Sequence, residues 1–292
     1  MKYNFIRREI GTNNCKKIST FETESEIFQT CLISNNGIML LQKNLPIISY
    51  ISINGKFTEE WMGKKTVNKI QNGSTDCIRL ISPCSITHDN TNAYVTEENG
   101  LSIRRFDLEN KYMSTYTGNN YKMRIEKYLS KNNNESIINS CVCNNAVVLS
   151  NNLANRCFAS RQGALQDIIG DGKRRFSVCS IYENSSINNP MGICNDKGFI
   201  YVSDTGNSCV RKIDLSKKYI SVFSGNPVKE KSYLKSPTIL KINKGILYVF
   251  DENSIKVTGT INDKIGNIYQ SDSIISYEVD DQRKLYLIER HD

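Results

Sequence analysis

Short apolar runs separated by clusters of turn-forming residues recur along the whole chain, and they predict β-strands. The segment Asn189–Gly225 shows the pattern most clearly, with strands expected at Met191–Cys194, Phe199–Val202, Cys209–Leu215 and Tyr219–Phe223. Asp, Asn, Ser and Gly fill the breaks between these runs, as tight turns require. The runs themselves are rich in the β-branched and aromatic residues that suit a pleated sheet. Four strands joined by such short turns form an antiparallel meander.

The same outline recurs at intervals of about fifty residues, which indicates a repeat architecture. One meander cannot bury both of its faces alone, so neighbouring copies must cover one another. The pattern therefore predicts an all-β protein, a six-bladed β-propeller of four-stranded antiparallel blades. The second strand of each copy is centred on Met39, Tyr94, Val147, Tyr201, Tyr248 and Tyr286.

The two ends of the chain each carry part of a blade. Residues 273–292 supply about two strands, and Tyr3–Gly11 has the pattern of an outer strand with no inner strands before it. Gly11 also falls on the spacing at which glycines end the fourth strand of other copies. Pairing of the N-terminal strand with the C-terminal strands would close the ring and remove exposed sheet edges. The glycines that define this spacing are Gly63, Gly118, Gly170 and Gly225.

We therefore expect one propeller domain over residues 1–292. An open array, or a ring of five or seven blades, stays an alternative because the third and fifth copies are weak. The blades are expected near 30–63, 77–118, 138–170, 188–225 and 235–266, with the last formed by 273–292 plus 1–11.

Three segments of the clearest copy carry a family resemblance. Pro190–Ile193, Ile200–Asn207 and Val210–Asp214 resemble the NHL-repeat β-propellers, and the likeness recurs more faintly at 82–86, 93–96 and 103–107. The resemblance implies a propeller fold. Members of this superfamily serve as protein-binding platforms, as RNA readers and, in relatives, as hydrolases or lyases, so the fold cannot select the function.

The charge balance is positive, with a net charge of +8. Such a balance fits an acidic partner, either RNA or an anionic protein surface, although a coding bias toward Lys and Asn produces the same total. Basic residues cluster after the turn at Gly170–Gly172, and basic pairs stand at matching places in two other copies. Alternation directs one residue of each pair toward a neighbouring blade and the other toward solvent. The candidate binding residues are Lys173, Arg174 and Arg175, followed by Arg104 and Arg211.

The chain contains ten cysteines, but they do not predict a disulfide framework. We find no secretory signal at the N-terminus and no apolar run long enough to cross a membrane, so we expect a reduced, cytoplasmic protein that does not contact membranes. Cys84, Cys141, Cys143, Cys194 and Cys209 lie within strands, where a small buried residue fits. No CxxC is present and there are only two histidines, so neither a zinc site nor any other cofactor is expected.

No sequence motif marks a catalytic centre. A nucleophilic triad needs a histidine base, but His88 lies in a turn and His291 is the penultimate residue. Relatives resembling gluconolactonases hold a divalent metal with Asp, Glu and Asn oxygens. Turn chemistry already explains the Asp and Asn residues of this chain that stand near strand ends.

We therefore predict a non-enzymatic binding or scaffold module that contacts a protein partner through one face of the propeller. That face would consist of the connections between blades and the turns between second and third strands. RNA binding through a basic face is the first alternative, and a metal-dependent hydrolase is the second. The loop Asn119–Ser140, which has near-helical spacing of apolar residues, is a further place where binding residues could lie.

Overall fold

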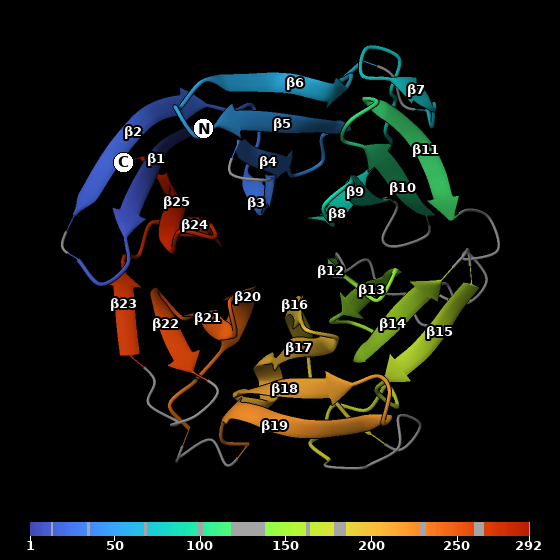
Figure 1. Ribbon diagram of the computed structural model, residues 1–292, viewed down its shortest axis with the longest axis vertical. Coiled ribbons are helices and arrows are strands. Elements are labelled where there is room, and N and C mark those ends of the chain that lie inside the picture. Colours follow the sequence, from blue (N-terminus) through green and yellow to red (C-terminus); the bar gives the residue numbers. More distant parts are fainter. Residues whose placement is uncertain are drawn as a thin grey trace. The chain divides into compact units, whose positions relative to one another are not determined.

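The computed structural model describes residues 1–12, 14–33, 36–66, 69–97, 102–117, 138–161, 164–177, 185–227, 232–259 and 266–291. Within these ranges the chain forms six antiparallel sheets, the blades of a six-bladed β-propeller (Figure 1). The predicted fold class is confirmed. Most of the loop Asn119–Ser140 lies outside the described residues.

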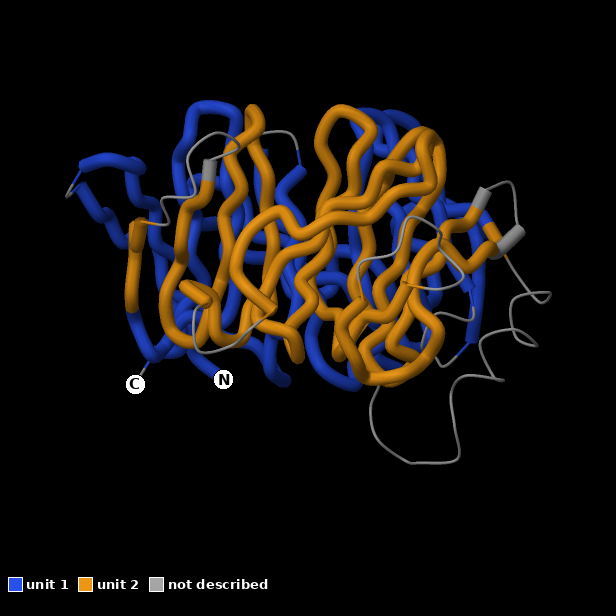
Figure 2. The backbone as a smooth tube through the Cα atoms, turned by 90° about the horizontal axis from the view of Figure 1, so that it is seen from below, with its two compact units in different colours: residues 1–116, 271–292 blue, residues 117–270 orange. Residues whose placement is uncertain are grey.

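The chain divides into two compact units, coloured separately in Figure 2. Unit 1 consists of residues 1–116 and 271–292, and unit 2 of residues 117–270. Each unit contains three of the sheets.

The three sheets of unit 1 include one that is built from both ends of the chain. Its strand order is β2-β1-β25-β24, with β1 at Lys2–Glu9, β2 at Cys15–Glu22, β24 at Ile274–Val279 and β25 at Lys284–Arg290. The second sheet holds β3 (Ile27–Ile33), β4 (Gly37–Gln42), β5 (Ile47–Ser52) and β6 (Phe57–Gly63). The third holds β8 (Pro83–His88), β9 (Asn92–Glu97), β10 (Ser102–Asp107) and β11 (Tyr112–Thr117), and the short β7 (Gly73–Ser74) pairs with β11.

The three sheets of unit 2 are simple meanders. The first holds β12 (Ile138–Cys143), β13 (Ala146–Asn151), β14 (Arg156–Arg161) and β15 (Ala164–Ile169). The second holds β16 (Pro190–Asp196), β17 (Phe199–Asp204), β18 (Cys209–Asp214) and β19 (Tyr219–Gly225), with a single 3₁₀ turn at Thr205–Asn207. The third holds β20 (Pro237–Asn243), β21 (Ile246–Asp251), β22 (Ser254–Gly259) and β23 (Gly266–Gln270).

The N-terminal strand pairs with the C-terminal strand, as we expected from the sequence. Phe5 of β1 lies opposite Ile288 of β25. However, β1 is the third strand of this sheet, and the outer strand is β2, which the sequence analysis did not assign. Gly11 consequently lies in the turn between β1 and β2 and does not end an outer strand.

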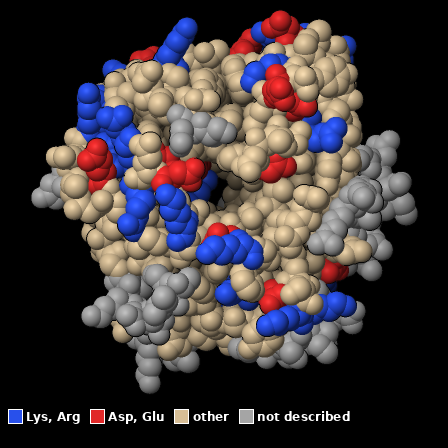
Figure 3. Space-filling model, viewed as in Figure 1, with Lys and Arg blue, Asp and Glu red and all other residues tan. Residues whose placement is uncertain are grey.

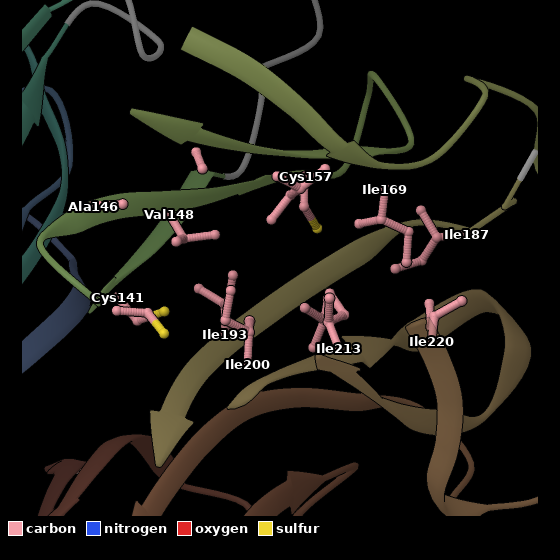
Figure 4. Close-up of a cluster of buried hydrophobic side chains, with 14 residues drawn as sticks. Cys141, Ala146, Val148, Cys157, Ile169, Ile187, Ile193, Ile200, Ile213 and Ile220 are labelled. Carbon is pink, nitrogen blue, oxygen red and sulfur yellow. The ribbon is translucent and has the colours of Figure 1, made fainter. Parts of the chain in front are cut away.

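The second strands are the most deeply buried elements of the sheets. Every residue of β4 and of β13 is buried. In unit 2, Cys141 and Cys157 pack in one apolar cluster with Ile193, Ile200 and Ile213 (Figure 4). Burial raises the pKa of the Cys141 thiol well above its ordinary value, so this thiol is a neutral packing group.

Candidate binding surface

Two of the five candidate binding residues are buried, which excludes them from direct contact with a partner. Arg211 forms an ion pair with Asp204 at 3.1 Å, and Arg104 forms one with Glu97 at 2.9 Å. All four side chains are 0% exposed. The expectation that Arg104 and Arg211 bind a partner is corrected here: strand alternation turns these two residues inward, where their charges are neutralised.

Each buried pair holds the connection that leads into its own blade. Arg211 donates from Nη2 to the carbonyl oxygen of Ser177 at 2.7 Å and lies 4.7 Å from the centre of the Phe176 ring. The Asp204 carboxylate accepts a hydrogen bond from the backbone N–H of Asn188 at 2.8 Å. The pair therefore holds two points of the connection between β15 and β16, one near its middle and one just before β16.

The same device occurs in two other blades. Arg104 donates to the carbonyl oxygen of Gln71 at 3.0 Å, while Glu97 accepts from the backbone N–H of Ile81 at 2.8 Å. In the third case Lys256 replaces the arginine and pairs with Asp251 at 2.5 Å. The sequence carries a signal for these pairs, because each acid ends a second strand and each base lies early in the next strand.

Burial raises the pKa of Asp204, even though Asn207, the Asn188 N–H and Arg211 all favour the charged carboxylate. This balance is typical of a structural ion pair in which both partners are removed from water. The conspicuous residues of the Ile200–Asn207 segment are thus occupied by internal contacts. Asn207 donates to the Asp204 carboxylate at 2.8 Å, and Thr205 donates to the carbonyl oxygen of Pro237 at 2.6 Å.

Lys173, Arg174 and Arg175 lie on the surface, in the connection that Arg211 holds. All three are exposed. Arg175 pairs with Asp171 at 2.7 Å and donates from Nε to the Ser186 hydroxyl at 2.8 Å. Lys173 and Arg174 have no ion-pair partner among the described residues, so their charges face solvent on a backbone that is held in place.

A second connection adds an aromatic residue that sequence reasoning missed. Tyr233, between β19 and β20, is 71% exposed, while its carbonyl oxygen accepts a hydrogen bond from Lys256 at 3.1 Å. Nearby Lys235 is 70% exposed and pairs with Glu252 at 3.3 Å. No periodic pattern surrounds Tyr233, so the sequence does not separate it from a core tyrosine.

The two connections flank one turn, Thr205–Ser208. Asn207 of this turn donates to the carbonyl oxygen of Arg175 at 3.3 Å, and Ser208 donates to that of Lys235 at 2.8 Å. The exposed residues of the two connections therefore belong to one region, at the end of unit 2 that carries the connections. We call it the connection surface and define it by Lys173, Arg174, Arg175, Tyr233 and Lys235.

The connection surface offers cations and an exposed aromatic ring on a fixed backbone, which suits recognition by contact. Tyr and Arg are enriched among the residues that dominate binding energy at protein interfaces. Among the residues that the structure describes, no group of three or more His, Cys, Asp or Glu side chains is placed to hold a metal ion. His88 contacts the carbonyl oxygen of its neighbour Asp89 through Nδ1 at 2.7 Å. None of the helices in the described ranges is both long and apolar enough to span a membrane.

The chain matches no protein-family model. It also matches no curated protein by sequence.

Several solved structures share the fold. A structure of the nidogen/laminin complex matches with a TM-score of 0.60 at 12% identity, covering 98% of this chain and 97% of the other. Virginiamycin B lyase from Staphylococcus aureus matches with a TM-score of 0.55 at 16% identity, covering 99% and 100%. An auxiliary nutrient binding protein from Bacteroides thetaiotaomicron matches with a TM-score of 0.57 at 8% identity, and this chain spans 61% of its length. Similarity at these identities concerns the fold alone.

Proposed function

We propose that the protein is a non-enzymatic binding module that holds a protein partner on the connection surface. The observation that carries this proposal is the presence of an exposed tyrosine and of two cations without an ion-pair partner among the described residues, on backbone that ion pairs with buried carboxylates hold in place. A rigid surface loses little conformational freedom on binding, so more of the contact energy appears as affinity. The NHL-like repeat of Pro190–Asp214 and the fold shared with a nidogen/laminin structure support the same assignment.

The partner is expected to present carboxylates around an apolar pocket. Lys173 and Arg174 would steer an acidic surface toward the module and contribute mainly to the association rate. The Tyr233 ring would fill the pocket, and its truncation to alanine is expected to cost about 2 kcal/mol of binding free energy or more.

Site-specific crosslinking tests the proposal. A photoreactive residue placed at Tyr233 should capture a partner, whereas the same residue at Tyr112, which is 50% exposed in unit 1, should not. The captured protein, once purified, should bind the wild type in a calorimetric titration and lose affinity for Tyr233→Ala and for Lys173→Glu/Arg174→Glu. Equal capture at both positions, or equal affinity of all variants, would reject the connection surface.

RNA binding at the same surface is the second candidate, favoured by the combination of cations with an exposed ring on which a base can stack. Filter binding of a single-stranded RNA at two salt concentrations separates the candidates. RNA binding should weaken with salt in proportion to the number of phosphate contacts. An affinity that is absent even at low salt would remove this candidate.

We further propose that the protein catalyses no reaction and acts in the cytoplasm with its thiols reduced. The shared fold with a lyase is compatible with either role, because unrelated activities occur on one fold. For the hydrolase alternative, calorimetric titration with Ca²⁺, Mg²⁺ and Zn²⁺ is decisive, since a stoichiometric site for any of them would contradict the non-enzymatic proposal.

A further inference from the structure

Lysines occupy turn positions in unit 2 that their backbone conformation disfavours. The turn between β16 and β17 consists of Lys197 (φ 47°) and Gly198 (φ 81°), and that between β20 and β21 of Lys244 (φ 49°) and Gly245 (φ 76°). Two-residue turns with positive φ at both positions prefer Asn, Asp or Gly at the first position. Lysine gains nothing from this left-handed conformation, so its presence calls for another reason.

The neighbouring blade shows what the backbone would prefer. The corresponding turn between β12 and β13 consists of Asn144 (φ 50°) and Asn145 (φ 59°). A third lysine, Lys218 (φ 52°), occupies the left-handed position of the turn between β18 and β19. Lysine thus stands at two such turns of unit 2 where the neighbouring blade has asparagine, while Lys218 matches Lys111 (φ 54°) at the equivalent turn of unit 1.

These turns lie at one end of the strands. In an antiparallel meander the turns between first and second strands and between third and fourth strands are at the same end, opposite the connections between blades. The turns also neighbour one another, because a Cβ built on Gly198 would lie 3.7 Å from the Asn144 amide and one on Gly245 would lie 4.0 Å from the Asp196 carboxylate. Figure 3 views unit 2 from this end and shows Lys and Arg side chains over β16–β21.

The cations are exposed, and two acids lie beside them, Asp196 near the Gly245 turn and Asp214 near the Lys217 turn. Lys197, Lys217, Lys218 and Lys244 are all exposed. The Asp214 carboxylate accepts hydrogen bonds from the backbone N–H groups of Ser216 at 3.0 Å and Lys217 at 3.1 Å. Tyr219, which follows Lys218, is 45% exposed. We define the turn surface by Lys197, Lys217, Lys218, Tyr219 and Lys244.

We propose that the turn surface binds an anionic membrane surface peripherally, in contrast to the expectation from the sequence that the protein does not contact membranes. The lysines stand in turns at the same end of the strands, so they can meet one counter-surface together. Clusters of four or more lysines are typical of contacts with acidic phospholipids, and lysine acts there as a point charge that needs no bidentate geometry. Tyrosine suits the headgroup region, because its ring is apolar and its hydroxyl is polar. This contact involves the end of unit 2 opposite the connection surface and does not depend on the function proposed for that surface.

Flotation with lipid vesicles tests the proposal. The wild type should float with phosphatidylcholine vesicles that contain about one third phosphatidylserine, and not with pure phosphatidylcholine. Binding should weaken as salt rises, because exposed charges are screened. No flotation with the acidic vesicles at low salt would overturn the proposal.

Asparagine substitutions separate binding from folding. Lys197→Asn/Lys244→Asn places the residue that the turns prefer, so the melting temperature should stay the same or rise, while vesicle affinity should fall about 25-fold, or about five-fold for each lysine. Conversely, Asn144→Lys should raise the affinity about five-fold by adding a cation at the equivalent turn. Unchanged vesicle affinity in all three positions would reject the turn surface.

The matched control carries the same charge change at the other end of unit 2. Lys173→Asn/Lys235→Asn removes two exposed lysines from the connection surface and should leave vesicle binding at the wild-type level. An equal loss in this variant would mean that net charge alone drives the association, which contradicts the proposal. Binding of a short single-stranded RNA that depends on Lys197 and Lys244, without binding of acidic vesicles, would also overturn it.

Discussion

A guanidinium group and a carboxylate can form a buried ion pair. When either partner is removed, the other remains as an uncompensated buried charge. Arg211 and Asp204 are the clearest case, since both side chains are 0% exposed. We predict that Arg211→Met lowers the free energy of unfolding by about 3–5 kcal/mol, as measured by urea denaturation. Arg104→Met should behave alike in unit 1, where Arg104 pairs with Glu97.

A double variant provides the control for this effect. Asp204→Leu/Arg211→Met replaces the ion pair by apolar groups and should recover much of the stability that the single variant loses. Destabilisation below about 1 kcal/mol in the single variants would show that the pairs do not hold the connections as described.

Asp214 connects the stability of a single turn to pH. The Ser216 hydroxyl donates to its carboxylate at 2.6 Å, and this hydrogen bond, followed by that from the Lys217 N–H, lowers the pKa of Asp214 below its ordinary value of 3.8. A carboxyl group whose pKa is lower in the folded state contributes stability above its unfolded pKa and loses it as pH falls through the folded pKa.

We therefore predict that Asp214→Asn makes the acid limb of the stability profile shallower below about pH 4. The measurement is urea denaturation at a series of acidic pH values. Asp107, which is held by Asn110 at the equivalent turn of unit 1, also has a lowered pKa, so Asp107→Asn is the matched variant. An acid limb identical to that of the wild type in both variants would contradict the role of these turns.

The role of the basic residues could be predicted from the sequence only in part, and alternation explains why. The pattern indicates that Arg104 and Arg105, or Arg211 and Lys212, point in opposite directions, but it does not say which of each pair lies inside. That choice depends on Glu97 and Asp204, which end the preceding strands and neutralise only the inward residue. Tyr233 could not be predicted at all, because its exposure depends on where the connection runs.

At the scale of the secondary-structure element, the sequence predicted those strands that are buried on both faces. All six expected second-strand centres lie in β4, β9, β13, β17, β21 and β25. In contrast, β2 was missed because an outer edge strand contacts the core with few of its residues. Lys16 and Lys17 of β2 are exposed, and Phe21 is its buried anchor.

The glycines that end outer strands show why the spacing of Gly11 misled the prediction. Gly225 has φ +82°, and a Cβ there would lie 2.6 Å from the Ser208 carbonyl oxygen. Gly63 and Gly170 are likewise crowded by the carbonyl oxygen of the residue that precedes the neighbouring strand. At Gly11, by comparison, φ is +90° but no atom lies within 4 Å of such a Cβ. Spacing alone does not distinguish a glycine required by close packing from one in an open turn.

We predict that Gly225→Ala lowers the free energy of unfolding by more than Gly11→Ala does. Both variants place a side chain at positive φ, which costs of order 1–3 kcal/mol, but only the first also collides with backbone. Thermal and urea unfolding of the two variants measure the difference. Equal destabilisation would show that conformation matters at these positions and close approach does not.

At the scale of the whole molecule, the net charge of +8 does not show where the charged side chains lie. In unit 2, exposed cations occur at both ends of the strands, on the connection surface and on the turn surface. The sequence predicts the total, but the topology assigns each lysine to an end. The two proposed contact surfaces therefore lie at opposite ends of unit 2.

The sheet that joins the two ends of the chain permits the last prediction. Tyr3 and Phe5 of β1 are 0% exposed, and their rings stack on Phe21 at 5.7 Å and on Tyr286 at 6.0 Å between centroids. Deletion of residues 1–22 removes β1 and β2, so it exposes the edge of β25 and opens the apolar cluster of unit 1. We predict that the truncated chain loses cooperative thermal unfolding and aggregates. Phe5→Ala should retain the fold but lose about 3–5 kcal/mol of stability, whereas Phe28→Ala, at a side chain that is 40% exposed, should change stability little. A truncated chain that melts cooperatively at the wild-type temperature would show that the terminal strands are not part of the structural core.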